Sequence, residues 1–217
     1  MSLSLLRRPG QIAAVLPTGL KSFMLVGTVW LVSRAGMAVV AGVEMARQEA
    51  SLTDVVSQWD VWHFLAIANK GYADWENVAF FPGLPLLLAG AGKLGLPPVA
   101  AGMAAALVAS GLAAWALVRL ANSAVACLWL IAPTAVFTAV PYSEALFCAA
   151  AFWAWWHATQ DRWGVAAALA GLACTTRVSG LFLIGALGLL AISQVWRTSG
   201  WGKGLARRWA WLPPSGH

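Results

Sequence analysis

Carboxylates are the groups in this chain best able to move protons, and most of them gather in one segment. Six of the eight acidic residues lie between residues 43 and 79, and they are Glu44, Glu49, Asp54, Asp60, Asp74 and Glu76. Partial removal from water raises the pKa of a carboxylate and strengthens its attraction for a hydroxyl proton, which suits a general base. We therefore expect any acid–base chemistry in this segment.

Residues 57–70 predict a short helix along a membrane surface, because they are rich in aromatic and aliphatic side chains but too few and too polar to span a bilayer. Helical spacing places four side chains along one stripe: Asp60, His63, Ile67 and Lys70. Two interpretations of Asp60 stay open. It is a general base beside a membrane-embedded cleft, or it completes a capping box with Ser57 and only satisfies free N–H groups.

The other polar residues of this segment also allow two interpretations. His63 is either an amphipathic residue at the membrane interface or a group that contacts substrate. The chain has three histidines and the other two are distant in sequence, so we expect neither a metal nor another cofactor. Asp74 and Glu76 are either solvated loop acids or a second carboxylate at a site, and Glu76 is kept as a second catalytic candidate.

Two arginines, Arg34 and Arg177, lie in apolar stretches. An unpaired charge in such a place costs several kcal/mol, so each should face a partner or a polar cavity. Hydroxyl residues surround Arg177 in the sequence, which would suit a phosphate that needs charge-assisted hydrogen bonds. The alternative is a structural ion pair with Glu144, which could equally be an acid at a helix N-terminus, stabilised by the helix dipole.

The composition places these residues in a membrane protein. The chain has 217 residues, of which 60% are hydrophobic and 10% charged, whereas about a quarter of the residues of a soluble domain are charged. Apolar segments long enough to cross a bilayer as helix recur along the chain. We expect them at residues 23–43, 80–97, 98–118, 121–140, 144–159 and 163–196, the last broken between Thr175 and Gly180.

These segments predict one all-α, polytopic membrane domain over residues 1–217, with six or seven membrane segments. The positive charges of Arg7, Arg8 and Lys21 precede the first span, so the N-terminus is expected in the cytosol and residues 43–79 form an external loop. Counting each apolar segment as one crossing puts Glu144 on the side opposite Asp60. A segment between 80 and 140 that fails to cross would reverse that count.

The net charge of +6 does not indicate a nucleic acid partner, because the 14 basic residues are dispersed. Their densest group lies among tryptophans near the C-terminus, at Arg197, Lys203, Arg207 and Arg208. Mixed basic and aromatic residues after an apolar segment are typical of a flank that contacts membrane lipids. The three cysteines, Cys127, Cys148 and Cys174, lie in apolar segments and are expected to pack there.

Four ordered blocks together resemble one family. They are WDxWHFxxIAxxGY, an acid followed by AFFPxxP, a proline ahead of PYSEALF, and TRxSGL. The family is that of the second mannosyltransferase of glycosylphosphatidylinositol synthesis, often called PIG-V. The matched residues are Trp59, Asp60, His63, Phe64, Ile67, Ala68, Gly71, Tyr72, Glu76, Phe80, Phe81, Pro82, Pro85, Pro133, Tyr142, Ser143, Glu144, Arg177 and Gly180.

This resemblance implies a GT-C type glycosyltransferase that moves mannose from a polyprenyl-phosphate donor to a hydroxyl of a lipid or protein acceptor, with inversion. It also implies an essential acid in the first external loop, which by position is Asp60. Asp60 would then take the acceptor proton, while a cation offsets the charge of the leaving phosphate. The expected substrate-binding set is His63, Lys70, Tyr142, Glu144 and Arg177, and Glu76 or Glu144 would hold sugar hydroxyls.

One departure from the family keeps other interpretations open. Its members are about twice as long, so the resemblance covers their N-terminal half. The chain could therefore be a truncated enzyme or a membrane subunit that needs a second chain, and buried charges also mark transporters and lipid-binding proteins. The location would be the plasma membrane in a bacterium, toward which the composition points, or the endoplasmic reticulum membrane in a eukaryote.

Overall fold

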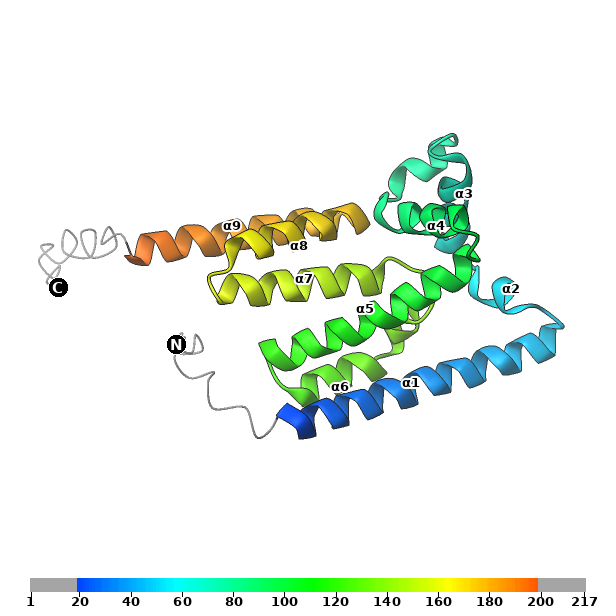
Figure 1. Ribbon diagram of the computed structural model, residues 1–217, viewed down its shortest axis with the longest axis horizontal. Coiled ribbons are helices and arrows are strands. Elements are labelled where there is room, and N and C mark those ends of the chain that lie inside the picture. Colours follow the sequence, from blue (N-terminus) through cyan, green and yellow to red (C-terminus); the bar gives the residue numbers. More distant parts are fainter. Residues whose placement is uncertain (1–18, 199–217) are drawn as a thin grey trace, which may run out of the picture.

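The structure is a computed structural model that describes residues 19–198, and every element in this range is a helix. The predicted all-α fold is confirmed for this part of the chain (Figure 1). The elements are α1 (Gly19–Gln48), α2 (Leu52–Val56), α3 (Asp60–Lys70), η2 (Trp75–Ala79), α4 (Gly83–Lys93), α5 (Pro98–Leu120), α6 (Ser123–Ile131), η3 (Pro133–Thr138), α7 (Glu144–Thr159), α8 (Trp163–Thr176) and α9 (Ser179–Thr198), where η marks a 3-10 helix.

Three helices of the described range are long and apolar enough to cross a membrane. They are α1, α5 and α9, of 30, 23 and 20 residues. Most large apolar side chains of α1 stay exposed, as expected for a surface that faces lipid. The shorter helices α6, α7 and α8 run alongside them in Figure 1. The number of six or seven membrane segments remains a prediction.

Helix α4 is only 11 residues long and lies beside α3 at one end of the bundle (Figure 1). It is too short to span a bilayer, and this places Glu144 at the same end as Asp60. A hydrogen bond of 3.2 Å from the Tyr142 hydroxyl to the carbonyl of Gln58 joins the two segments directly. The side of Glu144 that follows from counting every apolar segment as one crossing is therefore wrong, because α4 folds beside α3 and Glu144 lies at the same end as Asp60. We call this end of the bundle the α3 end.

Small side chains let the last three helices approach one another closely. The buried cluster between them consists of Ala154, Ala158, Ala166, Ala170 and Leu187. Membrane helices lack a hydrophobic driving force between them, so close van der Waals contact between small residues is what holds them together. Helices α7, α8 and α9 thereby form a firm support for the turns at their ends.

Two glycines make the turns at the α3 end possible. A Cβ on Gly180 would lie 2.5 Å from the backbone N and Cα of Cys174, so the α8–α9 turn folds directly against α8. A Cβ on Gly83 would lie 2.8 Å from the carbonyl oxygen of Thr175. The start of α4 therefore packs on the end of α8, and no larger residue fits at either contact.

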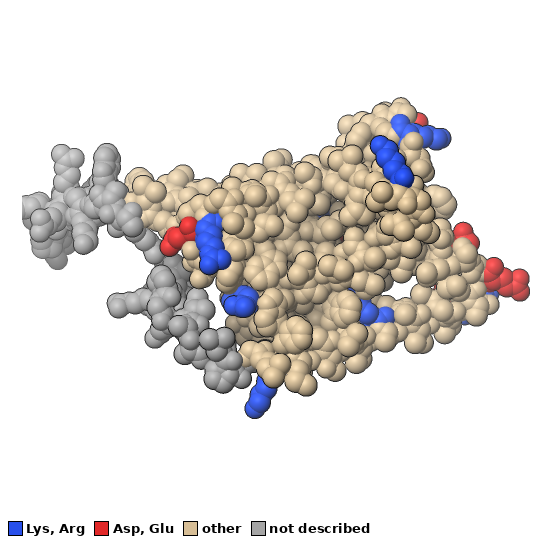
Figure 2. All heavy atoms as spheres, viewed as in Figure 1, with Lys and Arg blue, Asp and Glu red and all other residues tan. Residues whose placement is uncertain are grey.

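Charged side chains lie mainly toward the two ends of the molecule, and the surface between them is apolar (Figure 2). Glu49 and Asp54 are exposed where α1 ends and α2 begins, and Glu44 is partly exposed in the last turns of α1. The basic and aromatic C-terminal group predicted to contact lipid, from Lys203 to Trp211, lies outside the described residues, as do Arg7 and Arg8.

Candidate functional site

Helix α3 begins at Asp60, and the start is not the capping box that the sequence suggested. Trp59 is the N-cap residue and caps no N–H group with its side chain. Ser57 instead ends α2, and its hydroxyl is buried without a hydrogen-bond partner in the described structure. The capping interpretation of Asp60 is therefore wrong, because the chain breaks between α2 and α3 and assigns Ser57 to the earlier helix.

The capping box lies six residues earlier, at Ser51 and Asp54. The Ser51 hydroxyl accepts from the Asp54 amide at 3.3 Å, and the Asp54 carboxylate accepts from the Ser51 amide at 3.0 Å. The Ser51 hydroxyl and amide bonds also lower the pKa of the Asp54 carboxyl. The Asp60 carboxylate, by contrast, accepts no hydrogen bond within residues 19–198 and is partly exposed. It is thus open to a ligand.

The backbone is strained immediately before this carboxylate. Trp59 has φ 50° and ψ −117°, a conformation that is rare for a residue with a large side chain. Its ring is exposed and lies 6.4 Å from the Phe137 ring, centre to centre. This backbone conformation lies directly before Asp60, the first residue of α3.

Tyr142 connects α3 with the start of α7. Its ring packs against Phe64 and Phe137, at centroid distances of 6.5 Å and 5.2 Å. Burial raises the pKa of the Tyr142 phenol, and the negative charges of Asp60 and Glu144 raise it further. The two carboxylates therefore lie close enough to the same phenol to influence it, although they are 84 residues apart in the chain.

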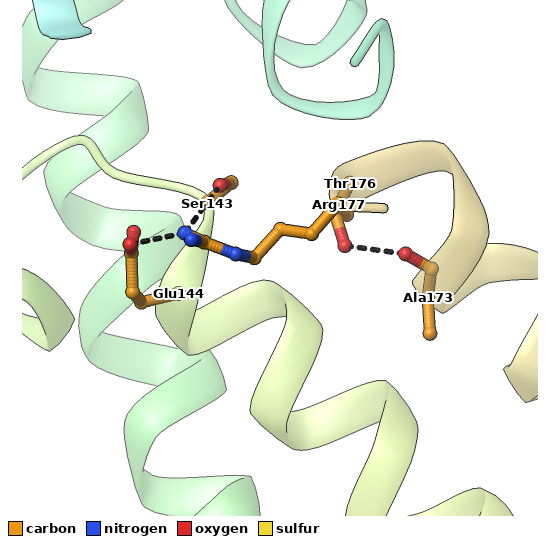
Figure 3. Close-up of polar contacts among 5 residues, drawn as sticks. All are labelled: Ser143, Glu144, Ala173, Thr176 and Arg177. Carbon is orange, nitrogen blue, oxygen red and sulfur yellow. Dashed lines mark hydrogen bonds and ion pairs between the residues drawn. The ribbon is translucent and has the colours of Figure 1, made fainter. Parts of the chain in front are cut away.

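Arg177 extends from the end of α8 toward the first residue of α7 (Figure 3). Its Nη1 forms an ion pair with Glu144 and lies 3.4 Å from the Ser143 hydroxyl. The side chains of Arg177 and Glu144 are 38% and 28% exposed. The alternative of an ion pair with Glu144 is confirmed. Every side-chain hydrogen bond of Arg177 to the described residues uses Nη1, so the other donors of the guanidinium have no partner among these residues.

The threonines before Arg177 do not direct their hydroxyl protons toward it. Thr175 donates to the Leu172 carbonyl and Thr176 to the Ala173 carbonyl, each at 2.7 Å. Figure 3 shows the Thr176 bond on the side of the helix away from the guanidinium. The cradle of hydroxyl donors expected for a phosphate is therefore missing at these two positions, and charge recognition here depends on Arg177 itself.

A second polar feature lies on the outer side of α3. It is a hollow of about 690 Å³ between α3 and the loop that leads through η2, lined by Trp62, His63, Ala66, Ala73, Asp74, Trp75, Glu76 and Asn77. His63 Nδ1 lies 2.9 Å from the Asn77 side-chain oxygen, and its ring stacks on Phe80 at 4.5 Å. His63 thus fixes the loop against α3. We call this feature the outer hollow.

The structure brings only some of the predicted site residues together. Asp60, Tyr142, Glu144 and Arg177 meet at the α3 end, whereas His63 and Glu76 lie at the outer hollow. Lys70 is exposed at the last turn of α3, roughly 15 Å along the helix axis from Asp60. Asn77 could not be singled out from the sequence, because it lies in η2 beyond the end of α3 and meets His63 only through the way the loop folds back.

No group of three or more histidine, cysteine or acidic residues in residues 19–198 is arranged to hold a metal ion. The described cysteines are free thiols within the helices. What the α3 end offers is therefore one open carboxylate, one phenol and one partly available guanidinium.

An all-helical membrane protein with its polar groups gathered beyond the ends of its helices is the class that this fold and site define. The chain belongs to the Mannosyltransferase (PIG-V) family, because the sequence model of that family matches residues 33–199. The match includes α3, the turn before α7 and the α8–α9 turn.

Individual relatives agree with this assignment. The GPI alpha-1,6-mannosyltransferase 2 of Mus musculus is 36% identical over 152 residues, and the proteins of the same name from Rattus norvegicus and Homo sapiens are 35% and 32% identical over 151 residues. Each match covers 61% of this chain but 31% of the relative. The chain thus spans less than a third of the relatives it matches. No solved structure matches significantly.

Proposed function

We propose that this chain takes part in the transfer of mannose from a polyprenyl-phosphate donor to the hydroxyl of a lipid or protein acceptor at a membrane. The observation that supports this most is the convergence of Asp60, Tyr142, Glu144 and Arg177, from three of the four family blocks, at one end of the bundle. Residues so distant in sequence rarely meet around an open carboxylate unless the site is used.

Asp60 is the proposed general base. In the reaction the bond between mannose C1 and the phosphate oxygen breaks, and C1 forms a new bond with the acceptor oxygen. The acceptor proton passes to the Asp60 carboxylate, and attack from the face opposite the phosphate inverts the anomeric centre. Because the departing phosphate is already a weak base, no separate acid is needed to protonate it.

Arg177 is the proposed partner of the leaving phosphate. Negative charge grows on the phosphate oxygen as the glycosidic bond breaks, and a guanidinium placed there stabilises the transition state more than the ground state. The ion pair with Glu144 holds Arg177 in position from one side, while its exposed atoms face outward. Positioned on a turn beyond the helix ends, this cation suits a donor whose phosphate lies at the membrane surface.

The test is transfer of radiolabelled mannose from polyprenyl-phosphate-mannose in membranes that contain the chain. We expect Asp60→Asn to reduce transfer by at least a factor of 100, because general base catalysis contributes about 10² to 10⁴. Asp54→Asn is the matched control, since that carboxylate serves a helix cap, and it should keep most of the activity. Unchanged transfer by Asp60→Asn would contradict the assignment.

One alternative is that the chain is a membrane subunit that acts together with a second chain. A second membrane protein that copurifies, and whose addition restores transfer, would support this alternative. Uptake of substrate into liposomes that contain the chain would instead support a transporter. Asp60→Asn separates both alternatives from the main proposal, because only the main proposal requires mannose transfer to depend on the Asp60 carboxylate.

A further inference from the structure

The outer hollow is suited to a sugar ring, and its chemistry differs from that of the Arg177 site. Trp62 and Trp75 line it with side chains that are 58% and 83% exposed. Asp74 and Glu76 line the same hollow and are also exposed. Neither acid pairs with a cation among the described residues, so both carboxylates are free to accept hydrogen bonds.

These two kinds of group match the two faces of a hexose. The C–H groups of a pyranose ring form an apolar face that packs against an indole, and its hydroxyls donate to carboxylate oxygens. A volume of about 690 Å³ is in the range of small-molecule sites, which combine apolar walls with a few polar groups. A metal ion fits less well, since the described residues hold no set of three ligands here.

The hollow is also held in shape before any ligand binds. Asn77 is 3% exposed and bonds to His63, while the Tyr72 hydroxyl donates to the Phe80 carbonyl at 2.9 Å. The first contact joins the loop to α3 and the second joins the two ends of the loop to each other, so binding would require little ordering of the loop. His63 is about one helical turn from Asp60, so the hollow begins within one turn of α3 from the residue that carries the open carboxylate.

We infer that the outer hollow binds a hexose unit of the acceptor, with Trp75 stacking on the ring and Glu76 and Asp74 accepting from its hydroxyls. The naming of the acceptor rests on the proposed function, whereas the binding of a hexose does not. Of the two roles that the sequence suggested for Glu76, this inference selects the binding of sugar hydroxyls over catalysis, and it gives His63 the role of a positioning residue.

Binding can be measured without donor or turnover. The probe is methyl α-mannoside, and the signal is saturation-transfer NMR on the purified full chain in detergent micelles. We expect a saturable signal from the wild-type chain. Trp75→Ala should lower this signal at least fivefold and Glu76→Gln about threefold, whereas Trp75→Phe should keep half of it or more. Trp196→Ala, which removes a 54% exposed tryptophan from α9, is the matched control and should leave the signal unchanged.

The inference is overturned if the wild-type chain gives no saturable signal, or if Trp75→Ala binds the sugar as well as the wild type does. Trp75 is so exposed that its removal should not affect folding, which a thermal midpoint would verify. In the transfer assay, Trp75→Ala should raise the KM for acceptor and leave the KM for donor unchanged. A chain that binds the sugar through Trp75 but transfers nothing would refute the proposed function and retain the hexose site.

Discussion

Arg34 and Arg177 are both cations in apolar parts of the chain, and the structure places them in opposite situations. Arg34, in the middle of α1, is 8% exposed and donates to the Thr138 hydroxyl at 2.7 Å and to the Ala135 carbonyl at 3.1 Å. Arg177 lies on a turn beyond the helix ends and is 38% exposed. The first cation is enclosed by neutral oxygens of η3, whereas the second pairs with a carboxylate and stays open.

This difference separates a structural charge from one that can act on a ligand. The guanidinium of Arg34 holds α1 against η3, and it is buried at that contact. Arg177 has donors left over and faces the end where Asp60 and Tyr142 lie. A buried charge therefore indicates function only when part of its hydrogen-bonding capacity remains accessible.

The largest expected effect is at Arg177. Replacement by alanine should lower mannosyl transfer by a factor of 100 or more, because one charge-stabilising donor contributes about 10² to 10³ to a rate. Arg177→Lys should recover only part of the activity, since the ammonium keeps the charge but loses the fork. The measurement is initial transfer rate in membranes, normalised to the amount of folded chain.

Arg34→Lys is the control that makes this comparison informative. It changes the chemistry of the other arginine in the same way, and it should leave the transfer rate per folded molecule within about threefold of the wild-type rate. If Arg34→Lys and Arg177→Lys lowered transfer equally, the separation of structural from ligand-binding charge would fail.

A smaller effect is expected at the turn that presents Arg177. Gly180→Ala should destabilise the protein by about 2 kcal/mol, because the new methyl group would contact the backbone of Cys174, which cannot move aside as a side chain could. Gly185→Ala in the same helix has open space around it and should be neutral or slightly stabilising. Unfolding in mixed micelles measures both variants, and equal stabilities would contradict the tight turn.

Much of this fold could be predicted from the sequence, because proline, glycine and charged residues interrupt the apolar runs at the helix ends. The segment expected at 144–159 coincides with α7, and the expected break near Thr175 separates α8 from α9. The side on which Glu144 lies could not be predicted by counting. That depends on how the segment around α4 folds, which its packing on α3 and α8 decides.

The candidate site shows the same limit at closer range. The pattern Ser-x-x-Asp occurs at Ser51 and again at Ser57, and both satisfy the sequence rule for a capping box. Only the first forms one, because the chain turns between α2 and α3 and buries the Ser57 hydroxyl. Asp60 was correctly predicted at the start of α3. That its carboxylate caps no N–H group follows from the turn between α2 and α3, and no local sequence pattern indicates this.

The smallest predicted effect tests the other half of the comparison, the neutral surroundings of Arg34. Thr138→Val removes the hydroxyl that accepts from Arg34 and keeps the size of the side chain, so it should cost about 1.5 kcal/mol of stability. Most of this cost arises from a buried cation that has lost an acceptor.

In an Arg34→Met background the same substitution should cost less than half as much, since only the bond from Thr138 to the Ala135 carbonyl is then lost. Thr138→Ser keeps the hydroxyl and should be nearly neutral in its effect on this coupling. An equal cost of Thr138→Val in both backgrounds would mean that Arg34 gains nothing from η3, and that its charge serves some purpose other than holding α1 in place.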